Sequence, residues 1–313
     1  MRILVLGAGG VGGYFGGRLA ESGADVTFLV RDKRAAQLAG GGLRIRSPAG
    51  DVDLPGLSTI VSATAAPAAL PPFDILLLAC KAYDLDDAMA AIAPYVSEGS
   101  AVVPLLNGMA HLDRLDARFG AGRVLGGLCQ IAATLAPDGE VRHLNTVHRL
   151  VFGERDRSAS ARVASLADVM SRARFDSRAS GDILQEMWEK WVMLAPLAAM
   201  TCLMRGSVGD IVAAEGGKAF AEDMVAECAA VAAAAGHAPR AKVLADARAR
   251  LTEPGSSFTA SMLRDIERGG PTEGEHVLGD LIARGAALGV ATPLLRLARC
   301  HVQVYERRRA APG

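Results

Sequence analysis

The sequence has few cysteines and no long apolar segment, and both features limit the class of protein it encodes. Its five cysteines are odd in number and never form a C-x-x-C pair, which argues against a disulfide framework and a zinc site. They are Cys80, Cys129, Cys202, Cys228 and Cys300. We interpret them as reduced thiols of a cytoplasmic protein. No apolar run approaches the ~18 residues of a membrane helix, and the run from Ile3 to Leu6 is too short for a signal peptide, so we expect no membrane partner.

An excess of charge of one sign is also lacking. The chain carries 34 basic and 34 acidic residues, so no net field attracts nucleic acid or an anionic membrane surface. The six histidines form no H-E-x-x-H or similar ligand pair, so we expect no metal site. Half of the residues are hydrophobic, and 313 residues suffice for two domains with separate cores. The expected partner is therefore a small molecule.

Glycine is plentiful near the N-terminus, where it forms a G-x-G-x-x-G motif. Residues 3–6 are typical of a strand buried on both faces, and a stretch with helical periodicity follows the motif. In this context the first glycine permits a tight turn, the second lets the backbone approach a pyrophosphate, and the third lets helix and strand pack closely. The motif predicts a dinucleotide site. The residues expected to bind the cofactor here are Gly7, Gly9, Gly10, Val11 and Gly12.

The residue after the second predicted strand, 25–30, bears on the choice of cofactor. Dinucleotide domains specific for NAD usually place an acidic residue there to bind the ribose hydroxyls. This chain has Arg31, which suits a 2′-phosphate, so NADP(H) is favoured over NAD(H). Asp32 is the competing signal, and we expect it in the turn or at the cap of the following helix.

Strands and helices continue to alternate after this point, which predicts a doubly wound α/β sheet. We expect strands at 75–79 and 101–105. Lys81 and Asn107 follow these strands at the carboxyl edge of the sheet, where ligands bind in such folds. A solvated lysine and a turn asparagine before glycine are the alternatives. Segments from 126 to 178 alternate apolar and polar residues, and we expect them to extend the sheet, partly antiparallel, within a Rossmann-like domain at 1–180.

The remaining residues, 181–313, predict a second, helical domain, so that the fold class is α/β plus all-α. The expected helices begin near Ile183, with Asp182 and Gln185 resembling a capping box, and continue at 218–235, 240–251, 261–268, 273–288 and 293–306. Lys190 lies on the mostly apolar face of the first helix, which Pro196 should kink. One interpretation is a lysine that extends from the edge of a core to solvent. The other is a partly desolvated proton donor, which carbonyl reduction requires.

The segments "GAGGVGGYFGGRLA", "CKAYD", "NGM", "WEKW" and "SSFTASMLRDIERGGPTE" together resemble the ketopantoate reductase family. Members of this family reduce 2-dehydropantoate to pantoate with NADPH, a step of pantothenate biosynthesis. The resemblance covers nearly the whole chain. It implies that the glycines hold the pyrophosphate and Arg31 the 2′-phosphate, while Lys81 and Asn107 approach the cofactor and the reacting centre.

The resemblance also implies roles in the helical half. Lys190 falls on the family's catalytic general acid, and Ser261 on a substrate-binding serine. Glu273 falls on a glutamate that contacts the cofactor side and helps to orient the site. The expected catalytic residues are thus Lys190, Glu273 and Asn107, with Lys190 and Ser261 at the substrate.

The chain departs from the family where asparagines usually bind the polar groups of the substrate. Those positions hold Leu194, Ala198 and Val208, which cannot replace the lost hydrogen bonds. Three functions therefore remain open: an NADPH-dependent reductase of ketopantoate, the same chemistry on a more apolar 2-oxo or 2-hydroxy acid, and an NADP-binding sensor without turnover. The sequence leaves open a monomer or a homodimer.

Overall fold

The computed structural model describes residues 1–61 and 71–311, which fall into two compact units. Unit 1 contains Met1–Leu106 and His111–Ile183, and unit 2 contains Asn107–Ala110 and Leu184–Gly313. The contacts of the short segment Asn107–Ala110 assign it to unit 2, although in the sequence it lies between two parts of unit 1.

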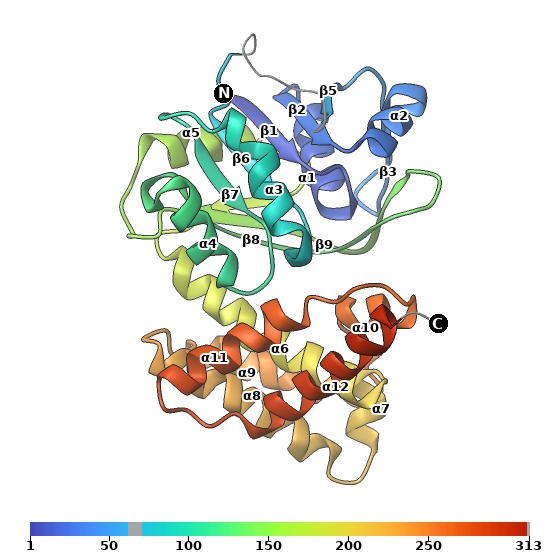
Figure 1. The fold of residues 1–313 in the computed structure, drawn as a ribbon, viewed down its shortest axis with the longest axis vertical. Coiled ribbons are helices and arrows are strands. Elements are labelled where there is room, and N and C mark those ends of the chain that lie inside the picture. Colours follow the sequence, from blue (N-terminus) through green and yellow to red (C-terminus); the bar gives the residue numbers. More distant parts are fainter. Residues whose placement is uncertain (62–70, 312–313) are drawn as a thin grey trace. The chain divides into compact units, whose positions relative to one another are not determined.

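A five-stranded parallel sheet forms the centre of unit 1, as the alternation of strands and helices predicts (Figure 1). The strand order is β5-β2-β1-β6-β7, and all four pairings are parallel. The strands are β1 (Arg2–Leu6), β2 (Asp25–Val30), β5 (Ser58–Val61), β6 (Ile75–Leu78) and β7 (Ala101–Pro104). The chain direction across the sheet reverses between β1 and β6, and the carboxyl ends of strands at such a switch point are where these folds bind ligands.

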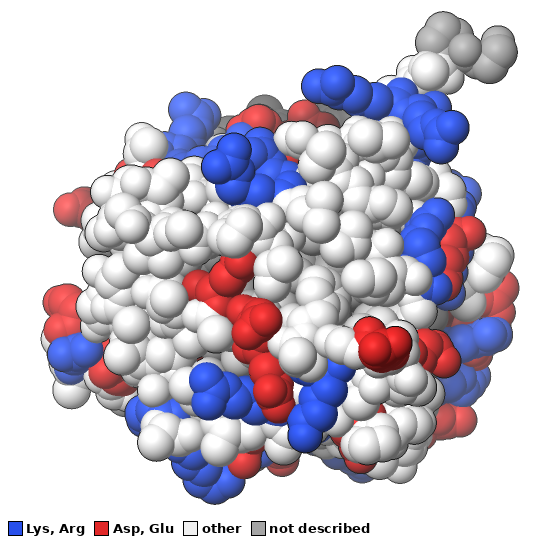
Figure 2. Space-filling model, turned by 90° about the horizontal axis from the view of Figure 1, so that it is seen from below, with Lys and Arg blue, Asp and Glu red and all other residues white. Residues whose placement is uncertain are grey.

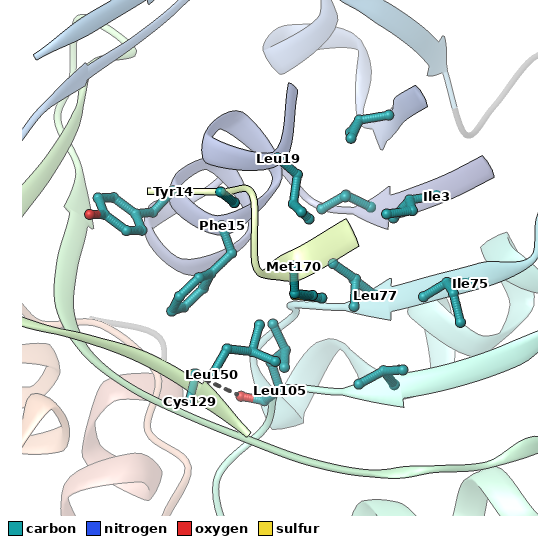
Figure 3. Packing of buried hydrophobic residues seen from close by; sticks show 14 of the residues in the cluster. Ile3, Tyr14, Phe15, Leu19, Ile75, Leu77, Leu105, Cys129, Leu150 and Met170 are labelled. Atoms are coloured by element: carbon teal, nitrogen blue, oxygen red, sulfur yellow. Dashed lines mark hydrogen bonds between the residues drawn. The ribbon is translucent and has the colours of Figure 1, made fainter. Parts of the chain in front are cut away.

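Helices follow the strands of this sheet along the chain, and the last of them leads out of the sheet after β7. They are α1 (Gly10–Glu21), α2 (Asp32–Gly41), α3 (Leu85–Ile92) and α4 (Ala110–Phe119), with the short 3₁₀ turns η1 (Ala82–Asp84), η2 (Ala93–Tyr95) and η3 (Ala121–Arg123). Phe15 and Leu19 of α1 and Ile75 and Leu77 of β6 belong to one buried core, which Figure 3 shows. This burial fixes α1, and with it the loop that precedes α1, on the sheet.

A second sheet in unit 1 corrects the prediction for residues 126–178. Strands form there, but they pair with an N-terminal hairpin in the order β10-β9-β3-β4, with β8 antiparallel to β9, and do not extend the first sheet. Alternation of apolar and polar residues identifies the buried face of a strand but not its partner. The helix α5 (Ala161–Met170), which the prediction missed, lies in this region. The strands are β3 (Leu43–Arg46), β4 (Val52–Leu54), β8 (Gly126–Leu135), β9 (Val141–Gly153) and β10 (Asp176–Ala179).

Unit 2 is built from helices in its described part. They are α6 (Ile183–Met204), α7 (Val208–Ala213), α8 (Gly217–Ala234), α9 (Ala241–Leu251), α10 (Ser261–Glu267), the π-helical turn η4 (Glu275–Gly279), α11 (Asp280–Ala287) and α12 (Pro293–Ala310). The positions agree with the predicted helices, except that α7 was not expected and that 273–288 divides into η4 and α11. Along residues 1–61 and 71–311, no helix is both long and apolar enough to cross a bilayer. On the face that Figure 2 shows, both basic and acidic side chains are present, with wide uncharged areas between them.

The start of α6 differs in detail from the prediction. The backbone amide of Asp182 donates to Ser180 Oγ at 3.1 Å, whereas the side-chain amide of Gln185 donates to Glu189 and to the carbonyl of Ala238. The backbone amide of Asp182 therefore does not make the reciprocal bond of the predicted capping box, but α6 begins at Ile183, as predicted. A reciprocal capping box forms instead at α7, between Ser207 and Asp210. α6 continues as one helix through Pro196.

Candidate active site

The glycine-rich loop between β1 and α1 has the geometry that a pyrophosphate requires. Gly7 adopts a left-handed conformation with φ of +88°, which makes the tight turn. A Cβ atom on Gly12 would lie 2.1 Å from the Gly7 carbonyl oxygen and 2.9 Å from Ala79 Cβ, so this glycine lets α1 approach the sheet. A Cβ atom on Gly9 would meet nothing within 4 Å. Backbone amides at the start of a 12-residue helix without an acidic residue in its first turn are therefore accessible to an anion, and the loop fits a dinucleotide.

A buried arginine that the sequence analysis missed is hydrogen-bonded to this loop. Arg34 Nε donates to the carbonyl of Ala8 at 2.9 Å, and its Nη1 donates to the carbonyl of Gly139 at 2.8 Å. Burial and the nearby Arg44 lower the pKa of Arg34. The guanidinium thus ties the middle of the glycine-rich loop to the turn between β8 and β9. In the sequence, the polar run "DKRAAQL" is typical of a solvated helix face and gives no sign of this burial.

Arg31 occupies the end of β2, as expected, and is the N-cap residue of α2. Its side chain is 68% exposed, and its Nη2 lies 3.0 Å from Asp84 Oδ1 and 3.9 Å from Asp87 Oδ2. The hydrogen bond and the charge of Asp84 raise the pKa of Arg31. Asp32 is the first residue of α2 and not its cap. A 2′-phosphate at Arg31 would therefore compete with Asp84 for the guanidinium.

The other expected cofactor residues of unit 1 lie around the switch point. Lys81 is half-buried, three residues beyond β6, and is the N-cap residue of η1. Gly10 begins α1, and a Cβ atom there would lie 2.8 Å from the carbonyl of Ala133 in β8. Val11 is half-buried in the first turn of α1. These positions follow from the carboxyl ends of β1 and β6.

In unit 2, the structure joins two of the expected catalytic residues. Lys190 is half-buried on α6, and its Nζ donates to Asn107 Oδ1 at 3.0 Å. A lysine ammonium has only donors, so the oxygen of the Asn107 amide faces it and the amide nitrogen is directed elsewhere. This pair offers a cation and an amide donor group together, which suits the carbonyl and carboxylate oxygens of a 2-oxo acid.

Glu189, next to Lys190, is a further residue that the sequence analysis missed. It is 5% exposed, and its Oε1 accepts hydrogen bonds from the backbone amide of Arg240 at 2.9 Å and from Arg240 Nε at 2.7 Å. Burial raises the pKa of Glu189, but hydrogen bonds from Arg240 and Gln185 prevail and leave that pKa below its ordinary value. This ion pair between a buried carboxylate and an exposed guanidinium attaches α6 to the N-cap of α9, one residue before the lysine.

Ser261 and Glu273 share unit 2 with Lys190. Ser261 is the half-buried first residue of α10. Glu273 is buried, 7% exposed, and its backbone carbonyl accepts from the amide of Val277 at 2.8 Å. A carboxylate is buried at this level only when its environment stabilises it, so the burial of Glu273 indicates polar surroundings.

The three apolar residues that the resemblance places at asparagine positions differ in accessibility. Leu194 is half-buried one turn after Lys190, whereas Ala198 is buried further along α6. Val208 is fully buried, and it is the first residue of α7 and not a loop residue, with its amide bonded to the carbonyl of Phe258 at 3.0 Å. Among these three positions, Leu194 therefore has the most side-chain surface available to a substrate.

A glycine-rich dinucleotide loop on a doubly wound sheet, together with a lysine on a helical unit, is the arrangement of a dinucleotide-dependent oxidoreductase. Comparison with known proteins identifies the family. The sequence model of "Ketopantoate reductase PanE/ApbA" matches residues 3–157, and that of its C-terminal part matches residues 182–306. The chain belongs to the ketopantoate reductase family, and it is an oxidoreductase acting on CH–OH or C=O groups.

Three similar proteins illustrate the range of this fold. An uncharacterized oxidoreductase of Bacillus subtilis, YkpB, is 37% identical over 98% of this chain and 99% of its own. The crystal structure of 2-dehydropantoate 2-reductase from Geobacter metallireducens has a TM-score of 0.87 and 30% identity, and the match covers 97% of this chain and 99% of that one. A ternary structure of D-mandelate dehydrogenase with NADH and anilino(oxo)acetate has the same fold, with a TM-score of 0.86 at 21% identity over 99% and 100% of the two chains.

Proposed function

We propose that this protein is an NADPH-dependent reductase of a 2-oxo acid, with 2-dehydropantoate as the first substrate to consider and pantoate as its product. The observation that carries the proposal is the hydrogen bond from Lys190 Nζ to Asn107 Oδ1, 3.0 Å long, in a half-buried position. Membership of the ketopantoate reductase family supports the substrate.

In this proposal Lys190 is the general acid. Reduction of a ketone leaves negative charge on its oxygen, and Lys190 Nζ donates a proton to that oxygen. Asn107 holds the ammonium through Oδ1 and presents its amide nitrogen to the substrate. We assign Ser261 to the substrate carboxylate or hydroxyl, and Glu273 to orientation of the site. Bound NADPH would supply the hydride that adds to the keto carbon.

The glycine-rich loop, Lys81 and Arg31 would hold the cofactor. Gly7, Gly9, Gly10, Val11 and Gly12 supply the backbone that accepts the pyrophosphate. Arg31 is the residue that favours NADP(H) over NAD(H), because a guanidinium binds a phosphate through two hydrogen bonds at once. This preference requires Arg31 to exchange Asp84 for the 2′-phosphate.

A second substrate class is favoured by one specific observation. Leu194 is half-buried one turn beyond Lys190, where the family usually has an asparagine. An apolar side chain there favours a 2-oxo acid with a bulky apolar group, and the fold also occurs in a D-mandelate dehydrogenase. The chemistry and the role of Lys190 are the same for both substrates.

The test is the initial rate of NADPH oxidation by the purified protein with 2-dehydropantoate, with an aryl 2-oxo acid, and without any keto acid. A kcat/KM above about 10⁴ M⁻¹s⁻¹ with 2-dehydropantoate would establish the first substrate. The same value with the aryl acid alone would establish the second class. NADPH binding without turnover of any 2-oxo acid would contradict the reductase and support a cofactor sensor.

A further inference from the structure

The chain neighbours of Lys190 and Asn107 both contact the same short element, the π-helical turn η4. Trp191 follows Lys190, and its Nε1 donates to the carbonyl of Val277 in η4 at 2.9 Å. Gly108 follows Asn107, and a Cβ atom on it would lie 3.0 Å from the carbonyl oxygen of His276 and 3.2 Å from its ring. Both halves of the lysine–asparagine pair are thus supported by consecutive residues of one turn.

Each of these contacts tolerates little displacement. The Trp191 side chain is 1% exposed, and a buried indole N–H without an acceptor is costly. Gly108 has a φ of +73°, a conformation that disfavours any side chain, so its close approach to η4 depends on glycine. The π-turn offers carbonyl groups outside the regular α-helical hydrogen-bond pattern, and such turns are frequent at functional sites.

The turn itself is fixed to α12. The Glu275 carboxylate accepts from Arg299 Nη2 and from Gln303 Nε2, both at 2.7 Å. Burial raises the pKa of Glu275, but these two hydrogen bonds and the charge of Arg299 prevail and keep that pKa below its ordinary value. These contacts at the surface link η4 to α12.

We propose that Trp191 is a positioning residue of the reductase, which acts through η4 to hold Lys190 at hydrogen-bond distance from Asn107. This inference rests on the proposed function, because it assigns a role relative to the proton donor. The indole fixes the rotation of α6 about its axis, and Gly108 fixes the backbone beside Asn107. Loss of the indole N–H lets the lysine turn away from the amide oxygen.

The test compares Trp191→Phe, which removes the N–H but keeps an aromatic ring, with Trp188→Phe as a matched control on the same helix. Trp188 is also buried, and its ring lies 5.1 Å from that of Trp191 and stacks on His237 at 5.6 Å. Trp188→Phe therefore disturbs the same ring packing but leaves the Trp191 donor to Val277 in place. With the better 2-oxo acid, we expect Trp191→Phe to lower kcat by about 10-fold or more, because small misplacements of a catalytic group are costly. The KM for NADPH should stay near the wild-type value.

The pH profile of kcat separates positioning from general packing. In Trp191→Phe the alkaline limb should move to lower pH, since the ammonium of Lys190 loses the acceptor that stabilises it. Trp188→Phe should leave the profile unchanged. A Trp191→Phe variant with the wild-type kcat and profile would overturn the inference, as would an equal loss in both variants.

Two further variants keep the outcome decisive. If Trp191→Phe does not fold, benzothienylalanine at position 191 preserves the shape of the indole without its donor and should give the same loss. Lys190→Ala tests the proposed function separately. Full turnover by Lys190→Ala would refute the lysine as acid, whereas loss in Lys190→Ala with wild-type behaviour of the position-191 variants would refute the positioning role alone.

Discussion

At the scale of single residues, Lys190 carries the chemical proposal. Replacing it with Ala should lower kcat by about two to four powers of ten, the usual contribution of a general acid, and leave NADPH affinity nearly intact. Steady-state rates and a fluorescence titration with NADPH measure the two quantities. Lys242→Ala is the control, since this lysine is 85% exposed and pairs with Asp246, one turn further along α9, at 2.8 Å. Wild-type turnover in Lys190→Ala would refute the role of Lys190 as the general acid.

Arg31 determines the second prediction at this scale. Arg31→Ala should weaken NADPH binding by about 10- to 100-fold, the value of one or two hydrogen bonds to a charged group, with little change for NADH. Asp84→Asn should have the opposite effect on NADPH, because it releases the guanidinium from its carboxylate partner. Lys33→Ala, an exposed cation on the same helix, is the control. The measurement is the dissociation constant of each variant for NADPH and for NADH at one ionic strength. Equal losses of affinity for the two cofactors would contradict a role of Arg31 at the 2′-phosphate.

At the scale of elements, the loop between β1 and α1 contains two glycines with separable roles. Gly12→Ala should destabilise the protein by on the order of 1–3 kcal/mol, because its Cβ atom would lie 2.1 Å from a backbone oxygen. Gly9→Ala should cost less than about 1 kcal/mol of stability. It should nevertheless weaken NADPH binding by roughly 10-fold, the equivalent of about 1.4 kcal/mol, because its methyl group would occupy the space of the pyrophosphate.

Denaturant unfolding and cofactor titration of both variants measure these effects. The arrangement described for the loop would be wrong if Gly9→Ala bound NADPH as well as the wild type, or if Gly12→Ala were as stable.

The elements also show what the sequence can predict and why. The strand, glycine turn and helix at the N-terminus follow from local rules, since φ, periodicity and close packing all act within residues 3–21. The pairing of β9 with β3 does not, because it joins distant parts of the sequence and alternation specifies only a face. η4 has no local signal at all: residues 273–288 have the period of one continuous helix, and tertiary contacts at Trp191 and Glu275 accompany the π-turn.

The candidate site shows the same division between local and non-local information. Arg31, Lys81 and Asn107 could be located because ligands bind at the carboxyl ends of parallel strands. The bond between Lys190 and Asn107 joins residues 83 positions apart, and the sequence identified each residue but not their contact. Arg34 was missed because nothing in a polar helix indicates that one of its cations is buried beneath the glycine-rich loop.

At the scale of the whole molecule, stability should depend on pH through His148. Its Nδ1 lies 2.6 Å from the Tyr14 hydroxyl, and its ring stacks on His143 with centroids 5.4 Å apart. Burial and the charges of His143 and Arg18 lower the pKa of His148 below 6.5, against the opposing charge of Asp176. The unfolded chain therefore binds more protons than the folded one below that pH, and folded stability must fall as the pH decreases through about 6.5.

Unfolding by denaturant at about pH 7.5 and about pH 5.5 measures this dependence. His148→Gln retains an acceptor for Tyr14 but cannot be protonated, so it should lose less stability on acidification than the wild type. His301→Gln, in α12, is the matched control. An unchanged pH dependence in His148→Gln would exclude this histidine as its source.

The placement of Asn107–Ala110 in unit 2 has a consequence for how such a protein can be divided or recombined. A gene fragment for residues 181–313 encodes the lysine without its asparagine partner, and the N-terminal fragment has the converse deficiency. Exchange of halves between relatives at this boundary would therefore join a lysine helix to a foreign asparagine loop. A chimera should therefore take Asn107–Ala110 and α6 from the same parent protein. The N-terminal and C-terminal halves cannot be exchanged independently without separating the lysine from its asparagine partner.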